Sequence, residues 1–228
     1  MIYRIGIEDI EPNHWVAWVF DLPGCFSAAR SHDEALANVS RRIVEYSDWL
    51  ASHGLGSVER TERMETEVTE SFRSFPSEGD YFVNAFFEDD RRPLATDEIE
   101  YALRLLEFSR RDLLAVVQPL SDERLDRPVA GEVQGCIRGI LHHIATAEWW
   151  YWDRLNLAFP REEMPDDTMA ALEKGRLLTK TRLPEVAGDT RITFRRGEQW
   201  SARKVVRRAL WHERAHTQQI QRYLSQGK

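Results

Sequence analysis

Hydrophobic and polar residues alternate in the first part of the chain and repeat with a helical period in the second part. Tyr3, Ile5 and Ile7 alternate with polar or small residues, which predicts a β-strand. A mostly apolar run at 15–20 predicts a second strand, and residues 25–29 predict a short third strand. The helix predicted next carries apolar residues three or four positions apart, at Leu36, Val39, Ile43, Tyr46 and Leu50. The first part is therefore expected to fold as an α+β domain.

Local sequence patterns indicate where this helix begins and ends, and they leave two possibilities for each of the segments that follow. A capping-box pattern at 31–34 marks the start of the helix, and Gly54 marks its end. The charged run at 59–70 could form a solvated edge strand or a mobile segment. An apolar run at 81–87 could add a strand to this domain or cover the helices that follow.

Four amphipathic helices are predicted from about residue 97 onward. The first begins with a second capping-box pattern at 97–100 and stops before Pro119. The third extends from about Pro165, which suits a first helical turn, to about Leu183. We therefore divide the chain into an α+β domain with the order β-β-β-α-β at 1–75, a connecting segment at 76–96, and an all-α up-down four-helix bundle at 97–228.

Composition narrows the class of protein. Of the 228 residues, 42% are hydrophobic and 30% are charged, which is typical of a soluble globular protein. The net charge of -7 argues against a general binder of nucleic acid or of anionic membranes. No apolar run reaches the ~18 residues that a membrane helix needs, and the N-terminus has no signal-peptide pattern. Because Cys25 and Cys136 lie in separate regions, we expect reduced thiols and a cytoplasmic protein.

Two histidines lie four residues apart in the last predicted helix. His212 and His216 share a face with Ala209, Glu213 and Ile220, because a helix turns by about 100° per residue. Two imidazoles one turn apart on a buried face are either well-bonded core side chains or two ligands of a metal.

The same string matches the H-E-x-x-H motif of zinc proteases, whose third ligand usually follows further down the chain. Residues 217–228 contain no His, Asp, Glu or Cys. A third ligand would therefore have to come from an upstream helix.

The upstream candidate lies in the second predicted helix of the bundle. His143 flanks the apolar stripe of that helix, whereas His142 points nearly opposite. One histidine from this helix and the His212/His216 pair would give three nitrogen ligands with an open position, as in catalytic metal sites. Three imidazoles suit Zn²⁺, Ni²⁺ or Fe²⁺, and raw affinity would also favour Cu²⁺.

These motifs resemble a known family. His143 is followed five residues later by Glu148 and then by aromatic residues, and a late His-x-x-x-His-x-x-Gln-Ile motif starts at His212. The pair of motifs resembles the DinB/YfiT-like metal-binding superfamily over residues 97–228. The resemblance implies an up-down four-helix bundle that binds zinc or nickel. It also implies a metal-dependent transferase that uses a low-molecular-weight thiol such as mycothiol, bacillithiol or glutathione.

The first part of the chain resembles a second family. The Asp-Leu-Pro-Gly-Cys segment at 21–25, and the Asp-Glu-Ala-Leu segment at 33–36 that opens the helix, resemble the HicB-like domain of antitoxins. Antitoxins of that family usually continue into a DNA-binding segment, but here a helical bundle without a basic recognition helix follows. We therefore expect no DNA binding, and an accessory role in packing or dimerisation.

Glu213 and Glu148 are the candidate catalytic residues. Glu213 could be a general base, an acceptor for a ligand N–H, or a structural partner of Arg214 or Arg207. Glu148 could act in the same ways from the second helix. Neither cysteine belongs to the histidine motif, so a reacting thiol would be supplied from outside as a cofactor.

The expected function is thus a metal-dependent thiol transferase that acts on a small-molecule substrate. One alternative is a non-catalytic interaction protein with a structural metal and a HicB-like partner-binding module. Another is a metal-dependent hydrolase. A second copy of the chain could be a partner, whereas nucleic acid and membranes are not expected as partners.

Overall fold

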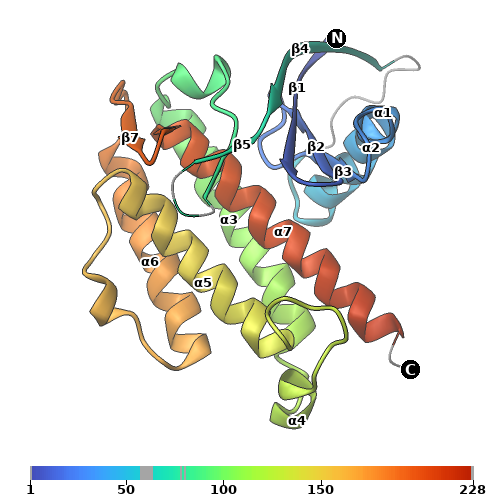
Figure 1. Cartoon of the computed structure of the whole chain (residues 1–228), viewed down its shortest axis with the longest axis vertical. Coiled ribbons are helices and arrows are strands. Elements are labelled where there is room, and N and C mark those ends of the chain that lie inside the picture. Colours follow the sequence, from blue (N-terminus) through green and yellow to red (C-terminus); the bar gives the residue numbers. More distant parts are fainter. Residues whose placement is uncertain (1, 57–63, 78, 80, 227–228) are drawn as a thin grey trace. The chain divides into compact units, whose positions relative to one another are not determined.

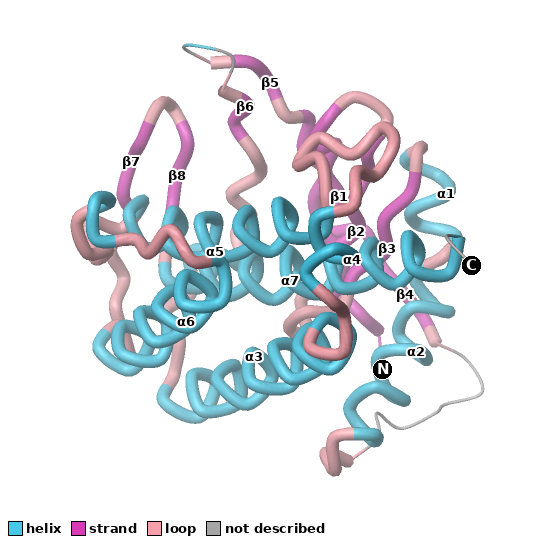
Figure 2. The backbone as a smooth tube through the Cα atoms, turned by 90° about the horizontal axis from the view of Figure 1, so that it is seen from below, coloured by secondary structure: helices cyan, strands magenta, loops and turns pink. Residues whose placement is uncertain are grey.

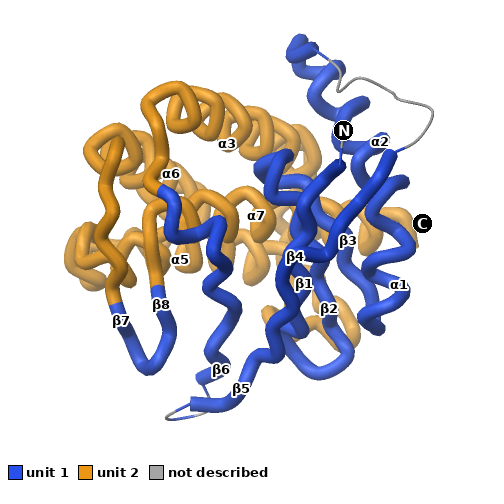
Figure 3. Tube along the Cα trace, turned by 90° about the horizontal axis from the view of Figure 1, so that it is seen from above, with its two compact units in different colours: residues 1–92, 194–199 blue, residues 93–193, 200–228 orange. Residues whose placement is uncertain are grey.

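The computed structural model describes residues 2–56, 64–77, 79 and 81–226. Backbone contacts divide the chain into two units (Figure 3). Unit 1 comprises Met1–Arg92 and Phe194–Gln199, and unit 2 comprises Pro93–Thr193 and Trp200–Lys228. The division between residues 92 and 93 falls inside the connecting segment expected at 76–96.

Unit 1 is built on a four-stranded sheet with the order β3-β2-β1-β4 (Figure 2). β1 (Ile2–Glu11), β2 (His14–Val19) and β3 (Phe26–Ala29) form consecutive antiparallel pairs. β4 (Glu65–Arg73) pairs in parallel with β1, as a strand reached through a helical crossover can do. The isoleucines that alternate along β1 at positions 5 and 7 are fully buried, as expected for the core side of a sheet.

The helix predicted after the third strand is divided in two. α1 (His32–Ala37) begins at Ser31, whose hydroxyl accepts a hydrogen bond from the Glu34 N–H at 3.3 Å. α2 (Val39–Ser52) follows directly after Asn38. The Asn38 side chain donates to the Glu34 carbonyl at 2.9 Å, and the Asn38 N–H donates to the same carbonyl at 3.2 Å. Asparagine side chains that bond to nearby backbone groups in this way are typical of helix ends.

The remainder of unit 1 holds short elements. The charged run expected at 59–70 contributes its later residues to β4, which is an exposed edge strand, while residues 57–63 lie outside the described residues. The apolar run that follows contributes β6 (Phe82–Val83), which pairs with β5 (Phe75–Pro76). A 3₁₀ turn, η2 (Asp89–Arg91), comes next.

The second part of the chain contains four long helices, close to the four that were predicted. They are α3 (Thr96–Val117), α5 (Ile137–Arg154), α6 (Thr168–Glu185) and α7 (Ala202–Gln226). The shorter elements are α4 (Asp122–Asp126), the 3₁₀ turn η3 (Arg161–Glu163), and the strands β7 (Thr193–Arg195) and β8 (Glu198–Trp200). Among the described residues, no helix is long and apolar enough to cross a membrane.

The ends of α6 differ from those predicted. The helix starts at Thr168 rather than at Pro165, because the Asp167 side chain accepts a hydrogen bond from the Ala170 N–H at 2.8 Å and caps it. Its last turn includes Pro184, which was expected to lie beyond the helix.

α5 and α6 run in the same direction, in contrast to the alternating up-down order expected from the sequence. A Cβ added to Gly175 would lie 3.2 Å from the carbonyl oxygen of Ala145, so the two helices approach closely there. Further along both helices, Trp152 donates to the Thr179 hydroxyl at 2.9 Å. Residues 155–167 carry the chain back along α5 before α6 begins, which leaves the two helices parallel (Figure 1).

α7 runs antiparallel to α5. The ring of Tyr151, near the end of α5, stacks on Trp200 just before α7 at 5.7 Å. His143, earlier in α5, meets His212 later in α7. The two helices that carry the candidate ligands are therefore direct neighbours.

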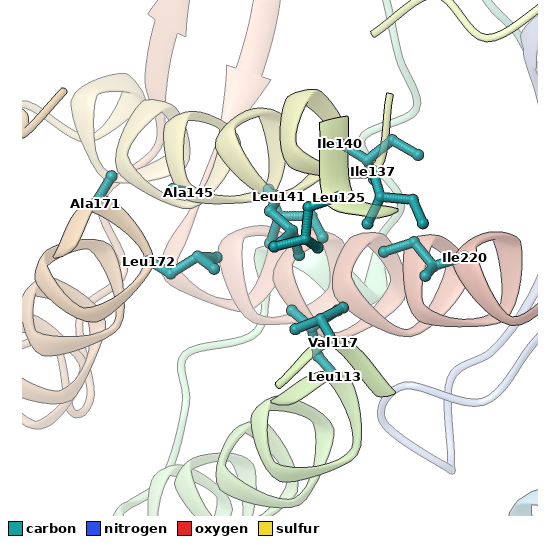
Figure 4. Packing of buried hydrophobic residues seen from close by; sticks show 11 residues of the cluster. Leu113, Val117, Leu125, Ile137, Ile140, Leu141, Ala145, Ala171, Leu172 and Ile220 are labelled. Atoms are coloured by element: carbon teal, nitrogen blue, oxygen red, sulfur yellow. The ribbon is translucent and has the colours of Figure 1, made fainter. Parts of the chain in front are cut away.

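One group of buried apolar side chains in unit 2 lies near α4 (Figure 4). Its buried side chains come from all four long helices and from α4, and we call this set the apolar cluster. Its members are Leu113, Val117, Leu125, Ile137, Ile140, Leu141, Ile144, Ala145, Ala171, Leu172 and Ile220.

Candidate metal centre

The three histidines chosen from the sequence converge at one point in unit 2. The Nε2 atom of His212 lies 2.9 Å from Nε2 of His143 and 3.1 Å from Nε2 of His216. One possible ligand atom from each residue lies within 4.8 Å of the others. α5 supplies the first histidine and α7 supplies the other two, one helical turn apart. His142, the neighbour on α5, is not part of this group.

Burial favours the neutral form of His212 and His216, which is the form that a metal ligand needs. Desolvation lowers the pKa of His212 well below the usual value for histidine, and nearby His216 and His143 lower it further. Burial also lowers the pKa of His216, although the hydrogen bond with Gln219 and the charge of Glu132 oppose part of that shift. A neutral imidazole has one unprotonated ring nitrogen, whose lone pair can bind a metal ion.

A hydrogen-bond chain orients the ring of His216. Its Nδ1 lies 2.6 Å from the amide oxygen of Gln219, which can only accept, so Nδ1 carries the proton and Nε2 keeps its lone pair. The amide nitrogen of Gln219 donates to Glu132 at 2.6 Å, and the Tyr223 hydroxyl donates to the same carboxylate at 2.7 Å. Such outer partners fix the ring and the tautomer of a metal-binding histidine.

The spacing of the nitrogens is close to that needed by a bound divalent ion. A tetrahedral ion 2.0–2.1 Å from each nitrogen would place neighbouring ligand nitrogens about 3.3–3.4 Å apart. The two Nε2–Nε2 distances of 2.9 and 3.1 Å are a few tenths of an ångström shorter, so small movements of the rings would accommodate the ion. Without a cation, an Nε2–H of His212 could serve only one of its two neighbours, whereas a cation satisfies all three nitrogens.

Aromatic rings lie against the most buried of the three histidines. The centroid of the Tyr151 ring is 6.1 Å from that of His212, and the Trp211 ring is at 5.8 Å. His212 is only 8% exposed, whereas His143 and His216 are half-buried. The histidine group therefore has aromatic rings beside His212, while His143 and His216 are more accessible to solvent.

Glu213, a candidate catalytic residue, is held by arginines of two other helices. Its Oε2 atom lies 2.7 Å from Nη2 of Arg110 and 3.0 Å from Nη2 of Arg176. Both of these partners are distant from Glu213 in sequence. Its Oε1 atom is buried and has no hydrogen-bond partner among the described residues.

Glu148, the other candidate, is bonded through both oxygens. Oε1 accepts from Nε of Arg176 at 2.8 Å and from the Thr179 hydroxyl at 2.7 Å, and Oε2 accepts from Nη2 of Arg110 at 2.9 Å. Burial alone would raise the pKa of Glu148, but the positive charges of Arg176 and Arg110 lower it overall. This carboxylate therefore stays charged and fully engaged.

The helices and the histidine group agree with one known family. The profile of the DinB superfamily matches residues 105–220, slightly more than half of the chain. The chain belongs to the DinB superfamily. Proteins of this superfamily are typically metal-binding, and the matched residues include the three histidines and both candidate carboxylates.

The family match does not extend to the first part of the chain. No curated protein and no solved structure matches the chain. Residues 1–104 lie outside the matched range, so the HicB-like character of the first part stays a prediction.

Proposed function

We propose that this DinB protein binds one divalent metal ion through His143, His212 and His216 and acts as a transferase that uses a low-molecular-weight thiol. The observation that carries the proposal is the convergence of three Nε2 atoms, with His216 oriented through Gln219. Zinc and nickel are the expected ions, because three imidazoles suit both of them.

The proposed reaction needs a coordination position that the protein leaves open. Among the described residues, the group that could hold an ion comprises three side chains, each offering one ligand atom. Tetrahedral zinc has four positions, so one would remain for a ligand from outside. When bound, a cation with three neutral ligands would stabilise a thiolate in place of a thiol.

The thiol is proposed to come from outside the chain. Cys25 is buried in unit 1. Cys136 is engaged at the start of α5, where its Sγ accepts a hydrogen bond from the Gly139 N–H at 3.4 Å. Neither cysteine belongs to the histidine group.

The two carboxylates receive different roles in this proposal. Glu213 keeps one buried oxygen without a hydrogen-bond partner among the described residues, so it is our candidate for accepting a proton. Glu148 uses both oxygens to bind other side chains. We therefore assign Glu148 a supporting role through the arginines it shares with Glu213.

Metal analysis tests the ligand set. Wild-type protein should contain close to one ion per chain, and His216→Ala should lose most of it. His142→Ala is the control, because it removes an imidazole next to His143 on α5, and His142 is not part of the histidine group. Equal metal content in wild type and His216→Ala would refute the assignment.

A spectroscopic titration tests the transferase. Co²⁺-substituted protein should develop a thiolate-to-metal absorption band when mycothiol, bacillithiol or glutathione is added, and His212→Ala should show none. If no biological thiol changes the spectrum, the ion has a structural role and the interaction-protein alternative takes the place of the enzyme.

A further inference from the structure

Four charged side chains, one from each long helix, form a buried cluster in unit 2. They are Arg110 of α3, Glu148 of α5, Arg176 of α6 and Glu213 of α7, and we call them the ion quartet. Their exposed fractions are 7%, 4%, 5% and 2% respectively. The two positive and two negative charges balance.

The ion quartet joins α5 to α7 through the arginines of α3 and α6. Nη2 of Arg110 lies 2.9 Å from Oε2 of Glu148 and 2.7 Å from Oε2 of Glu213, so one nitrogen bridges the two helices. Arg176 makes a second bridge, with Nε 2.8 Å from Oε1 of Glu148 and Nη2 3.0 Å from Oε2 of Glu213.

The two arginines also bind each other's helix. Arg110 donates to the carbonyl of Leu172 at 2.7 Å, and Leu172 lies four residues before Arg176. Arg176 donates to the carbonyl of Leu106, which lies four residues before Arg110. A slip of α3 against α6 by one residue would break both bonds.

Stability alone does not explain such a cluster. The loss of hydration on burying charges offsets much of their attraction, and apolar side chains of similar volume often stabilise a protein as well or better. Buried polar groups are better attested as devices that fix the register of helices. A metal centre assembled from two helices depends on that register.

We infer that the ion quartet positions the histidines by setting the register in which α5 presents His143 to α7. Glu213 directly follows His212, and Glu148 lies about 1.4 helical turns beyond His143. A shift of α5 by one residue would move His143 by about 1.5 Å along the helix and about 100° around it. The inference rests on the proposed metal site, and it makes Arg110 a positioning residue.

The test removes both bridges between α5 and α7 without leaving an unpaired charge. In the double variant Arg110→Met/Glu148→Met, Arg176 and Glu213 remain as a balanced pair, but α5 is no longer joined to α7. The affinity for Co²⁺ or Zn²⁺, measured by competition with a chromophoric chelator, should fall by about 10–100-fold. The visible spectrum of bound Co²⁺ should also change, while the thermal unfolding midpoint of the metal-free protein stays close to that of wild type.

The matched control is the double variant Glu107→Met/Lys180→Met. This half-exposed pair, 2.6 Å apart, joins α3 to α6 and does not touch α5 or α7, so metal affinity should stay at the wild-type level. If the apolar quartet variant does not fold, Arg110→Gln/Glu148→Gln tests the same loss with polar side chains.

The outcomes separate the two proposals. A folded quartet variant with wild-type affinity and spectrum would overturn the positioning role and leave the metal site standing. Wild-type protein that binds no ion would overturn the metal site and, with it, the positioning role.

Discussion

The four long helices of unit 2 are held together in two different ways along their length. Near α4 they share the apolar cluster (Figure 4), and all four also meet in the ion quartet. Other apolar side chains, such as Leu105, Leu178 and Leu210, are buried outside the apolar cluster. Apolar contacts are non-directional, so they favour close packing without selecting one register. Hydrogen-bonded ion pairs form only when particular atoms meet. The comparison indicates that stability and ligand geometry come from different residues, and that mutations can separate them.

The largest loss of stability is expected from breaking the ion quartet unevenly. Arg176→Met leaves two buried carboxylates with one arginine, and the free energy of unfolding should fall by about 3–5 kcal/mol. Urea denaturation followed by circular dichroism measures this loss. Arg138→Met is the control, because Arg138 pairs with Asp122 and Asp126 at the surface and its loss should have a much smaller effect. Equal losses would show that burial does not set the strength of these pairs.

A substitution in the apolar cluster should reduce stability without changing the metal centre. Ile140 is fully buried, and Ile140→Ala should lower the free energy of unfolding by about 2–5 kcal/mol. The folded protein should still bind metal with wild-type affinity, because the ion quartet keeps α5 in register. A loss of affinity as large as that of the Arg110→Met/Glu148→Met variant would erase the distinction between the two regions.

A smaller effect, on affinity alone, is expected at Gln219. Gln219→Ala removes the acceptor for Nδ1 of His216 and should weaken metal binding about tenfold. The unfolding midpoint of the metal-free protein should hardly change, since neither the apolar cluster nor the ion quartet is touched. Gln226→Ala, near the end of the same helix, provides the control. Isothermal titration that finds the same affinity in both variants would contradict the orienting role of Gln219.

Acid should reduce the contribution of the ion quartet to stability, because it protonates Glu148, whereas the apolar cluster has no group to protonate. The folded-state pKa of Glu148 is lowered, so its contribution to stability is present above the unfolded-state pKa of roughly 4.3 and is lost as the pH falls through the folded value. The free energy of unfolding should therefore decline below about pH 4.3 in wild type. In Glu148→Gln that part of the decline should be absent. Identical pH profiles would contradict the assignment.

The sequence predicted correctly those features that depend on the helical repeat of apolar residues. Apolar stripes located α3, α5 and α7, and the stripe of α5 selected His143 over His142 as the partner of the pair on α7. Both inferences depend only on the helical repeat. Two prolines, Pro165 and Pro184, located α6 approximately. The division of the early helix at Asn38 was missed because the apolar stripe continues across it.

Other features depend on contacts between distant segments. The parallel course of α5 and α6 follows from the path of residues 155–167, which no periodicity records. The sequence contains only a weak indication of the arginines that bind the two carboxylates. Arg110 lies between Leu106 and Leu113 on an otherwise apolar stripe, which indicates a buried charge. The sequence contains no indication of Glu132, because it lies in a loop and its hydrogen-bond connection to His216 runs through Gln219.

The separation of the ligands along the chain has a consequence for how the protein is made. His143 and His212 are 69 positions apart, and the whole of α6 lies between them. At synthesis rates of about 5–20 residues per second, the second ligand follows the first after roughly 3–14 s. During that interval α5 and α6 can form and pack, but a three-histidine site does not yet exist. A metal ion would therefore be captured only after α7 is made, by a chain whose other long helices are already in place.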